Sequence, residues 1–230
     1  MIESSAISDS LVSAIASSAR QAVPFEHVLL SSCFPRELYK SMISNFPRKE
    51  YLTPLRHADA MVNGELTRLQ LNLGKEAWDR LPVPEVGFWK GVHAGVTSRA
   101  VRDALFSVHK EVLEERHGPA FERMRMEIRA TLICDLAGYR IGIHPDIASK
   151  IVTTQFYLPV DDSRSHIGTR FYRVEEKGFA FDRQVQFLPN SGYSFPVTDT
   201  SFHGVSPLDA VDSPRYSIML VYYAIKRASV

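Results

Sequence analysis

The most informative stretch of the chain is 139-YRIGIHPDIASKIVTTQFYLP-159. It places His144 and Asp146 two residues apart, directly before an alternating run at 151–159. An imidazole and a carboxylate this close together in the sequence can be interpreted in two ways. One is a surface turn around Pro145, in which Asp146 caps neighbouring amides. The other is a metal site whose third ligand comes from elsewhere in the chain.

The alternation of residue types around this stretch indicates the fold. In 151–159, Val152, Thr154, Phe156 and Leu158 alternate with more polar residues, and 125–134 repeats the pattern with one apolar face and one largely polar face. This period of two predicts strands. Further strands are expected at 168–174, 183–189, 192–196 and 215–223. Six short strands in about a hundred residues, following helices, predict a mainly β fold with supporting helices around a double-stranded β-helix (jelly-roll, cupin-like) core.

The first 120 residues have mixed periodicity. Helices are expected around 11–22, at 34–47 and at 96–118, where Ser98 is the expected N-cap and Gly118 the expected end. A short strand is expected after Pro24, and no βαβ pattern indicates a nucleotide-binding sheet. The length favours one domain over 1–230, with a mixed support region at about 1–120 and the jelly-roll core at about 121–225.

Composition narrows the classes of partner. The chain has 27 basic and 26 acidic residues and a formal net charge of +1, so neither nucleic acid nor an anionic membrane is an expected partner. No apolar run reaches the roughly 18 residues of a membrane span. The N-terminus lacks a basic signal-like region, and the two cysteines, Cys33 and Cys134, provide no disulfide framework. We therefore expect a cytoplasmic protein.

Two histidines compete for the third ligand position. His166 lies in the polar segment DDSRSHIGTR and is expected in a loop, whereas His203 lies in SFHGVSPL, at a polar-to-apolar transition typical of a strand start. Arg215 and Ser217 follow His203 at the opening of the most apolar strand. His203 is therefore the preferred ligand. The remaining histidines are expected on the surface or on helix faces: His27, His57, His93, His109 and His117.

The ordered tract GYRIGIHPD…K…TTQFYLP…GT.FY…PNSGYSF…SFHGV…RYS resembles the bacterial prolyl-hydroxylase-like branch of the Fe(II)/2-oxoglutarate-dependent oxygenases. The resemblance covers roughly 24–47 and 121–223. It implies Fe(II), 2-oxoglutarate and O2 as cofactors, with ascorbate as a stimulant. By the same resemblance, the metal ligands are His144, Asp146 and His203, and the residues for the far carboxylate of 2-oxoglutarate are Arg215, Ser217 and Tyr157.

The resemblance also implies a reaction class. Family members couple oxidative decarboxylation of 2-oxoglutarate to attack on an unactivated C–H bond. Halogenating members have a small residue where this chain has Asp146, so hydroxylation, desaturation or ring closure is expected here.

The substrate is less well defined. A small metabolite, such as an amino acid or natural-product intermediate, is the preferred substrate, and a protein or saccharide is the alternative. Residues 48–95 and 160–182 are expected to border the site mouth. Candidate substrate contacts are Arg129, Thr131 and Gln155, and the competing interpretation is a solvated or salt-bridged face.

A catalytically inactive, cupin-like binding or scaffold protein is the competing class. A degenerate site of that kind is expected to have lost at least one of four residues, and all four are present: His144, Asp146, His203 and Arg215.

Overall fold

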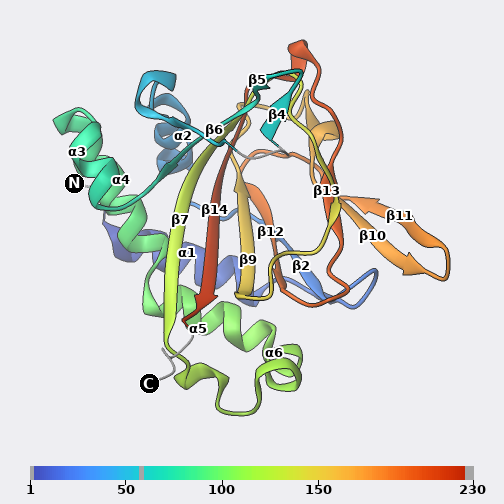
Figure 1. Ribbon diagram of the computed structural model, residues 1–230. Coiled ribbons are helices and arrows are strands. Elements are labelled where there is room, and N and C mark those ends of the chain that lie inside the picture. The colour runs from blue at the N-terminus through green and yellow to red at the C-terminus, as the bar shows by residue number, and fades with distance from the viewer. Residues whose placement is uncertain (1–2, 57–59, 226–230) are drawn as a thin grey trace, which may run out of the picture.

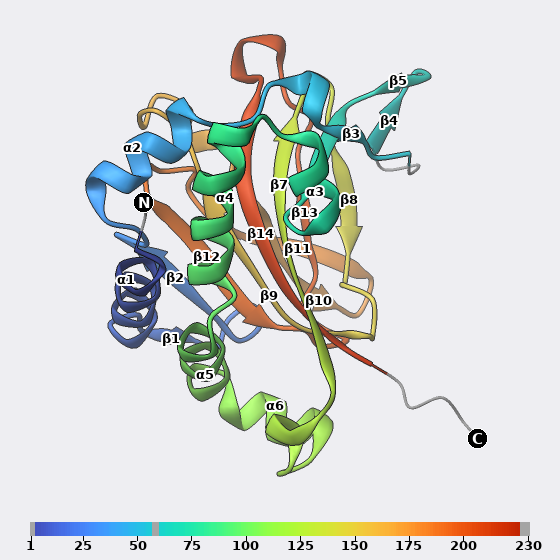
Figure 2. The same cartoon turned by 90° about the vertical axis from the view of Figure 1, so that its left-hand side faces the viewer.

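The computed structural model describes residues 3–56 and 60–225. Its elements form three layers, with helices on one side, a large twisted sheet in the middle and a smaller sheet on the other side (Figure 1). Turned by 90°, the view shows α4 and α5 lying across the large sheet (Figure 2).

Both main sheets are antiparallel throughout. The large sheet has eight strands in the order β1-β2-β12-β9-β14-β7-β6-β3, and the small one has four in the order β11-β10-β13-β8. The strands of the large sheet are β1 (Arg20–Gln21), β2 (His27–Ser31), β3 (Thr53–Pro54), β6 (Arg68–Asn72), β7 (Met126–Asp135), β9 (Lys150–Tyr157), β12 (Ser191–Pro196) and β14 (Arg215–Ala224). Those of the small sheet are β8 (Ile141–His144), β10 (Arg170–Glu175), β11 (Gly178–Gln184) and β13 (His203–Val205), and a separate hairpin consists of β4 (Met61–Val62) and β5 (Glu65–Leu66).

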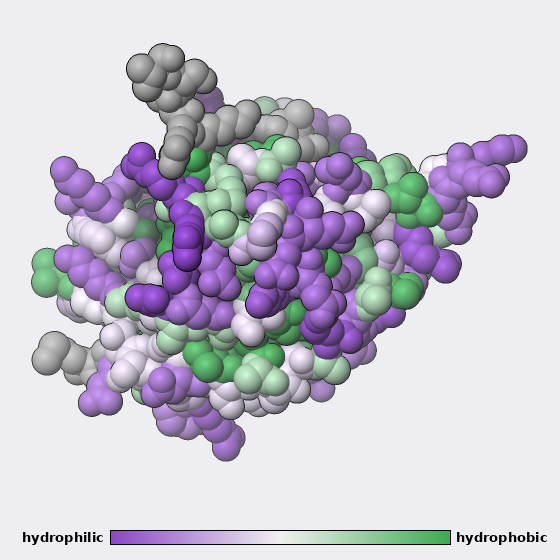
Figure 3. All heavy atoms as spheres, turned by 90° about the horizontal axis from the view of Figure 1, so that it is seen from below, coloured by the Kyte–Doolittle hydropathy of each residue, from purple (hydrophilic) through white to green (hydrophobic). Residues whose placement is uncertain are grey.

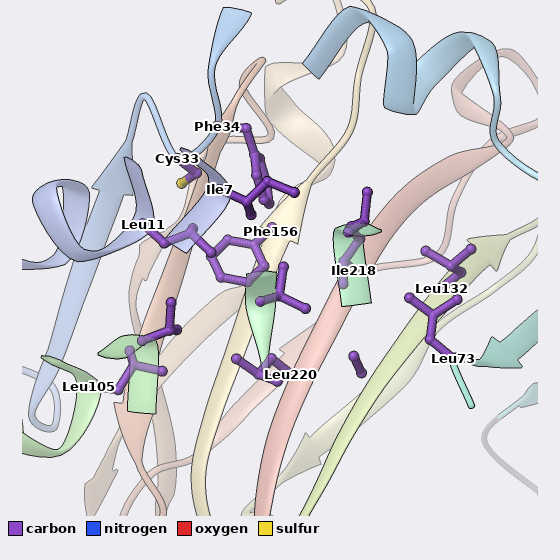
Figure 4. Close-up of a cluster of buried hydrophobic side chains, with 14 of the residues drawn as sticks. Ile7, Leu11, Cys33, Phe34, Leu73, Leu105, Leu132, Phe156, Ile218 and Leu220 are labelled. Carbon is purple, nitrogen blue, oxygen red and sulfur yellow. The ribbon is translucent and has the colours of Figure 1, made fainter. Parts of the chain in front are cut away.

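The helices cover the outer face of the large sheet. They are α1 (Ser4–Ala16), α2 (Arg36–Ser44), α3 (Lys75–Arg80), α4 (Val83–Val96), α5 (Arg99–Val108) and α6 (Lys110–His117). Leu11 of α1 and Leu105 of α5 meet Phe156, Ile218 and Leu220 of the sheet in the main core (Figure 4). Each large apolar side chain buried in this way stabilises the fold by about 1.5–3 kcal/mol.

The alternation along β14 assigns its two faces. Ile218 and Leu220 are fully buried against the helices, whereas Arg215 and Ser217 face the small sheet, and all four are inaccessible to solvent. A second core between the sheets contains Tyr157, Phe171, Phe187, Tyr193 and Phe195. The inner face of the large sheet is therefore partly polar, and its part around Arg215 and Ser217 is enclosed, which is where a polar ligand can be held.

The β10–β11 hairpin leaves the body of the molecule. Seen from below, it projects at the right with a hydrophilic tip, and hydrophobic residues lie closer to its base (Figure 3). Phe179 and Phe181 of β11 are exposed, at 44% and 53%. No helix among the described residues is long and apolar enough to cross a membrane.

Most of the predicted elements are present, with three corrections. The predicted strand 183–189 is wrong, because β11 ends at Gln184 and residues 185–187 instead cross over Gly168, leaving no room there for a Cβ. The predicted helix 96–118 is two helices, which join at His109. The first helix begins at Ser4 and ends at Ala16, earlier than predicted. Ser98 caps α5, as predicted, by accepting a hydrogen bond from the Val101 amide at 3.3 Å.

The placement predicted for the other histidines is wrong for two of them. His27 and His109 are fully buried. His109 contacts Glu26 through Nδ1 at 3.1 Å and Ser194 through Nε2 at 3.1 Å, so it joins the bend before β2 to β12. His57 lies outside the described residues.

Candidate metal centre

Three side chains from two neighbouring strands and a turn converge between the sheets. His144 ends β8, His203 opens β13, and the two residues are opposite each other in the antiparallel ladder. Asp146 lies in the turn after β8. One ligand atom from each of the three residues lies within 4.8 Å of the other two. The structure thus brings together the two-residue motif and the distant histidine preferred from the sequence.

Both imidazoles are held in a tautomer that leaves Nε2 free to bind a metal. Nδ1 of His144 lies 2.8 Å from the carbonyl oxygen of Gly142, and Nδ1 of His203 lies 3.0 Å from that of Ser201. A carbonyl oxygen only accepts hydrogen bonds, so Nδ1 carries the proton in each ring. Nε2 then keeps its lone pair, and backbone contacts of this kind orient metal-binding histidines.

Burial favours the metal-binding charge state of His203, and neighbouring groups favour that of Asp146. It lowers the pKa of His203 from 6.5 to about 4, so this ring is neutral at neutral pH. Burial alone would raise the pKa of Asp146, but the charge of Lys150, the electrostatic interaction with His203 and hydrogen bonds from Lys150 and Thr153 hold it below its ordinary value. The Thr153 hydroxyl donates to Oδ2 of Asp146 at 2.6 Å, and Lys150 Nζ lies 2.5 Å from Oδ1.

His166, the other candidate for the third ligand position, lies outside this cluster. Its side chain is 63% exposed, and Nε2 contacts Asp212 at 3.0 Å. The choice of His203 over His166 therefore agrees with the geometry.

A row of alternating charges crosses three strands at one end of the inner face. Arg68 on β6 and Arg215 on β14 are both opposite Asp135 on β7. Arg68 Nε contacts Asp135 Oδ1 at 2.5 Å, and Arg215 contacts Oδ2 through a terminal nitrogen at 2.7 Å. Two guanidinium groups share one carboxylate, so the row has one excess positive charge. Arg215 Nε is buried and has no hydrogen-bond partner among the described residues.

The three residues predicted to hold the far carboxylate of 2-oxoglutarate lie together beside this row. Ser217 and Tyr157 are opposite each other in the β14–β9 ladder, and the Arg215 guanidinium carbon is 5.5 Å from the Tyr157 ring centre. All three are fully buried. The Tyr157 hydroxyl donates to Thr169 Oγ1 at 3.0 Å, and the same oxygen accepts from a terminal nitrogen of Arg215 at 3.3 Å.

The residues predicted to contact substrate occupy three different surroundings. Gln155 lies inside, donating to Ser217 at 2.8 Å and accepting from Tyr193 at 2.6 Å. Thr131 is buried and donates to Asn72 at 2.7 Å. Arg129 is half-exposed at the rim and pairs with Glu127 at 2.6 Å. Only Gln155 has hydrogen bonds to the network around Arg215, and whether any of the three touches substrate stays a prediction.

A pocket of about 300 Å³ opens next to two of the three metal-ligand candidates, His144 and Asp146. It is lined by His144 and Asp146, by Arg68 and Lys150, and by apolar residues from two regions of the chain: Leu55, Ala60, Tyr139, Ile141, Pro145 and Ile147. Residues 55, 60 and 68 belong to the 48–95 region, which was expected to border the site.

Sequence reasoning missed Arg68, Asp135 and Lys150. Asp135 had a usable signal, because a carboxylate at the inward-facing position of an apolar strand needs a buried cation. Lys150 had a weaker signal, four residues after Asp146. Arg68 had none, since only the register of β6 against β7 places it opposite Asp135.

Comparison with known proteins gives a likeness in fold. No family sequence model matches the chain, and no curated protein matches it in sequence. Among solved structures, a prolyl hydroxylase from Trichoplax adhaerens, in complex with a hypoxia-inducible-factor peptide fragment, matches with a TM-score of 0.56 and 12% identity, over 96% of this chain and 90% of that chain. A Pseudomonas putida prolyl-4-hydroxylase matches with a TM-score of 0.52 and 12% identity, over 95% and 99%. The chain has the fold of the 2-oxoglutarate-dependent Fe(II) oxygenases.

A third structure agrees with this conclusion. A Burkholderia pseudomallei oxidoreductase of the 2OG-Fe(II) oxygenase family matches with a TM-score of 0.52 and 12% identity, over 88% of each chain. The predicted jelly-roll core is confirmed by these matches together with the two facing antiparallel sheets. At 12% identity the likeness concerns the oxygenase fold, so the assignment of site residues depends on the distances and hydrogen bonds of this chain.

Proposed function

We propose that the protein is an Fe(II)- and 2-oxoglutarate-dependent oxygenase that hydroxylates an unactivated C–H bond of a small metabolite. The observation that carries the proposal is the convergence of His144, Asp146 and His203, with both imidazoles fixed by Nδ1 hydrogen bonds to backbone carbonyls. Two neutral imidazoles and one carboxylate with open positions are the ligand set of non-haem Fe(II) oxygenases.

The charges on the inner face of the large sheet also suit the carboxylate groups of 2-oxoglutarate. The Arg68–Asp135–Arg215 row has one excess positive charge and a buried, unpartnered Arg215 Nε. A buried charge of this kind needs a counter-ion, and guanidinium pairs well with a carboxylate. Arg215 would hold the C5 carboxylate, with Ser217 and Tyr157 beside it. The iron and 2-oxoglutarate would together supply the oxidising chemistry, with O2 as the oxidant.

The chain itself would orient the ligands and limit access of water. Thr153 and Lys150 hold the Asp146 carboxylate in place and keep it ionised. The hydrogen-bonded set Gln155, Ser217, Thr169 and Tyr193 fixes the polar wall between the metal ligands and Arg215. A wall whose polar groups are already paired leaves few positions for stray water. The pocket of about 300 Å³ lies at the small end of the range for ligand pockets, which supports a small substrate.

An anaerobic binding experiment tests this proposal. We expect Fe(II) and 2-oxoglutarate together to give a visible charge-transfer band that depends on both components. Admission of O2 is expected to release succinate. His144→Ala is expected to abolish the band, whereas His166→Ala, which removes an exposed histidine outside the site, is expected to retain it.

The opposite result favours the scaffold class. If correctly folded protein gives no band and 2-oxoglutarate does not raise its unfolding temperature, the oxygenase proposal is wrong.

A further inference from the structure

Lys150 faces the metal centre because of an irregularity in β9. In the β14–β9 ladder, Tyr222 is opposite Val152 but Tyr223 is opposite Lys150, so Ile151 is an extra residue in β9. Such a bulge changes which face the following side chain occupies. Without it, Lys150 would share a face with Val152 and Thr154, which point away from the small sheet. With it, Lys150 shares the inner face with Tyr223.

The position of the bulge is fixed by neighbouring contacts. Arg116 of α6 donates to the carbonyl oxygens of Ala148 and Lys150 at 3.1 and 3.3 Å. The Lys150 amide donates to the carbonyl oxygen of Ile147 at 2.9 Å. The backbone conformation therefore directs the Lys150 side chain toward the site, and this side chain is only 15% exposed.

Counting the charges around the site shows that Lys150 would have no counter-ion once Fe(II) and 2-oxoglutarate are bound. Among the described residues, Asp146 is the only hydrogen-bond or ion-pair partner of Lys150 Nζ. A bound Fe(II) would be neutralised in part by the negative charge of that carboxylate. Fe(II) and Asp146 leave one positive charge, which the C1 carboxylate of 2-oxoglutarate would cancel. Its C5 carboxylate would cancel the excess charge of the arginine row. The charge of Lys150 then has no counter-ion, and a largely desolvated ammonium needs one.

The pocket that Lys150 lines could hold a ligand with an anionic group and an apolar part. Its other lining residues include Tyr139, Ile141 and Ile147, which offer apolar surface next to His144 and Asp146. The ammonium has three N–H donors and uses one of them on Asp146, so two remain for a ligand.

From this geometry we infer that Lys150 binds the anionic group of the substrate, which is a small apolar carboxylic acid. This inference rests on the proposed oxygenase function and names the substrate class of the same site. Lys150 acts as a specificity-determining residue, because a neutral analogue of the same shape leaves its charge unpaired.

Matched probes test the inference without turnover. The protein is loaded anaerobically with Mn(II) and 2-oxoglutarate, and binding of hexanoate, 4-methylpentanoate and 3-phenylpropanoate is compared with binding of their amides. We expect at least one acid to bind about 10- to 100-fold more tightly than its amide, as a charged hydrogen bond gives. Lys150→Met is expected to remove this preference while Mn(II) still binds. Lys150→Arg keeps the charge and is expected to retain the preference.

A second lysine provides the control. Lys110 is 56% exposed and pairs with Glu114 on α6, so Lys110→Met is expected to bind acids as the unaltered protein does. Equal binding of acids and amides, no binding of any probe to the loaded protein, or an acid preference that persists in Lys150→Met overturns the inference and leaves the oxygenase proposal standing. Failure of Mn(II) and 2-oxoglutarate to bind in the first place refutes the oxygenase proposal, and this inference with it.

Discussion

Replacing Asp135 by Asn tests the buried charge row. The exchange keeps the shape of the side chain but leaves Arg68 and Arg215 facing each other with no anion between them. Asp135 and Arg215 are fully buried, and the Arg68 side chain is 13% exposed. Removing one partner from a buried ion pair costs about 3–5 kcal/mol. In a chain of this size, each kcal/mol lowers the unfolding temperature by roughly 2–4 °C. We therefore expect Asp135→Asn to lower the unfolding temperature by roughly 6–20 °C in a thermal scan.

A matched control is available on α5. Asp103 also lies between two arginines, with contacts to Arg102 at 2.6 Å and Arg99 at 3.4 Å, but it is 51% exposed. Exposed pairs contribute about 0–1 kcal/mol, so Asp103→Asn is expected to change the unfolding temperature by less than roughly 4 °C. Equal shifts in the two variants would refute the reasoning, because they would mean that burial of the Asp135 row has no energetic consequence.

Two further predictions concern stability. Burial lowers the pKa of His109 below 6.5 in the folded state, so the unfolded chain binds more protons and the free energy of unfolding should fall as pH drops below about 6.5. Urea titrations at pH 7.5 and 5.5 should show a smaller fall in His109→Gln, and an equal fall would contradict the assignment. Gly168→Ala should lose more than about 2 kcal/mol, because the added methyl overlaps the Val185 carbonyl, whereas Gly87→Ala in α4 meets no neighbour and should gain about 0.5–1 kcal/mol. Similar effects of the two glycine changes would show that residues 185–187 do not pack on Gly168 as described.

The inner and outer faces of the core strands were predictable from sequence, since a period of two assigns every second residue to one face. Arg215 and Ser217 follow from this rule once Ile218 and Leu220 are assigned to the helix side. The convergence of His144, Asp146 and His203 was predictable because a two-residue motif and a histidine at a strand start are local signals. These parts depend on neighbouring residues only.

The parts that sequence reasoning missed depend on distant partners. A histidine within the predicted helix 96–118 was expected on the surface or on a helix face. The burial of His109 is explained by its contacts with Glu26 and Ser194, which lie more than 80 positions away in the sequence. The pairing of Arg68 with Asp135 depends on the register of β6, and the orientation of Lys150 depends on one extra residue in β9. Register and bulges are properties of strand pairs, which periodicity within one strand does not reveal.

The most direct test of the metal centre is an equilibrium titration with Fe(II) under argon in the presence of 2-oxoglutarate. One ion is expected to bind per chain, and His203→Ala is expected to weaken binding more than about 100-fold, since changes to outer residues alone weaken metal sites by about 10- to 100-fold. Unchanged Fe(II) binding in a folded His203→Ala variant would show that the three side chains do not hold a common ion.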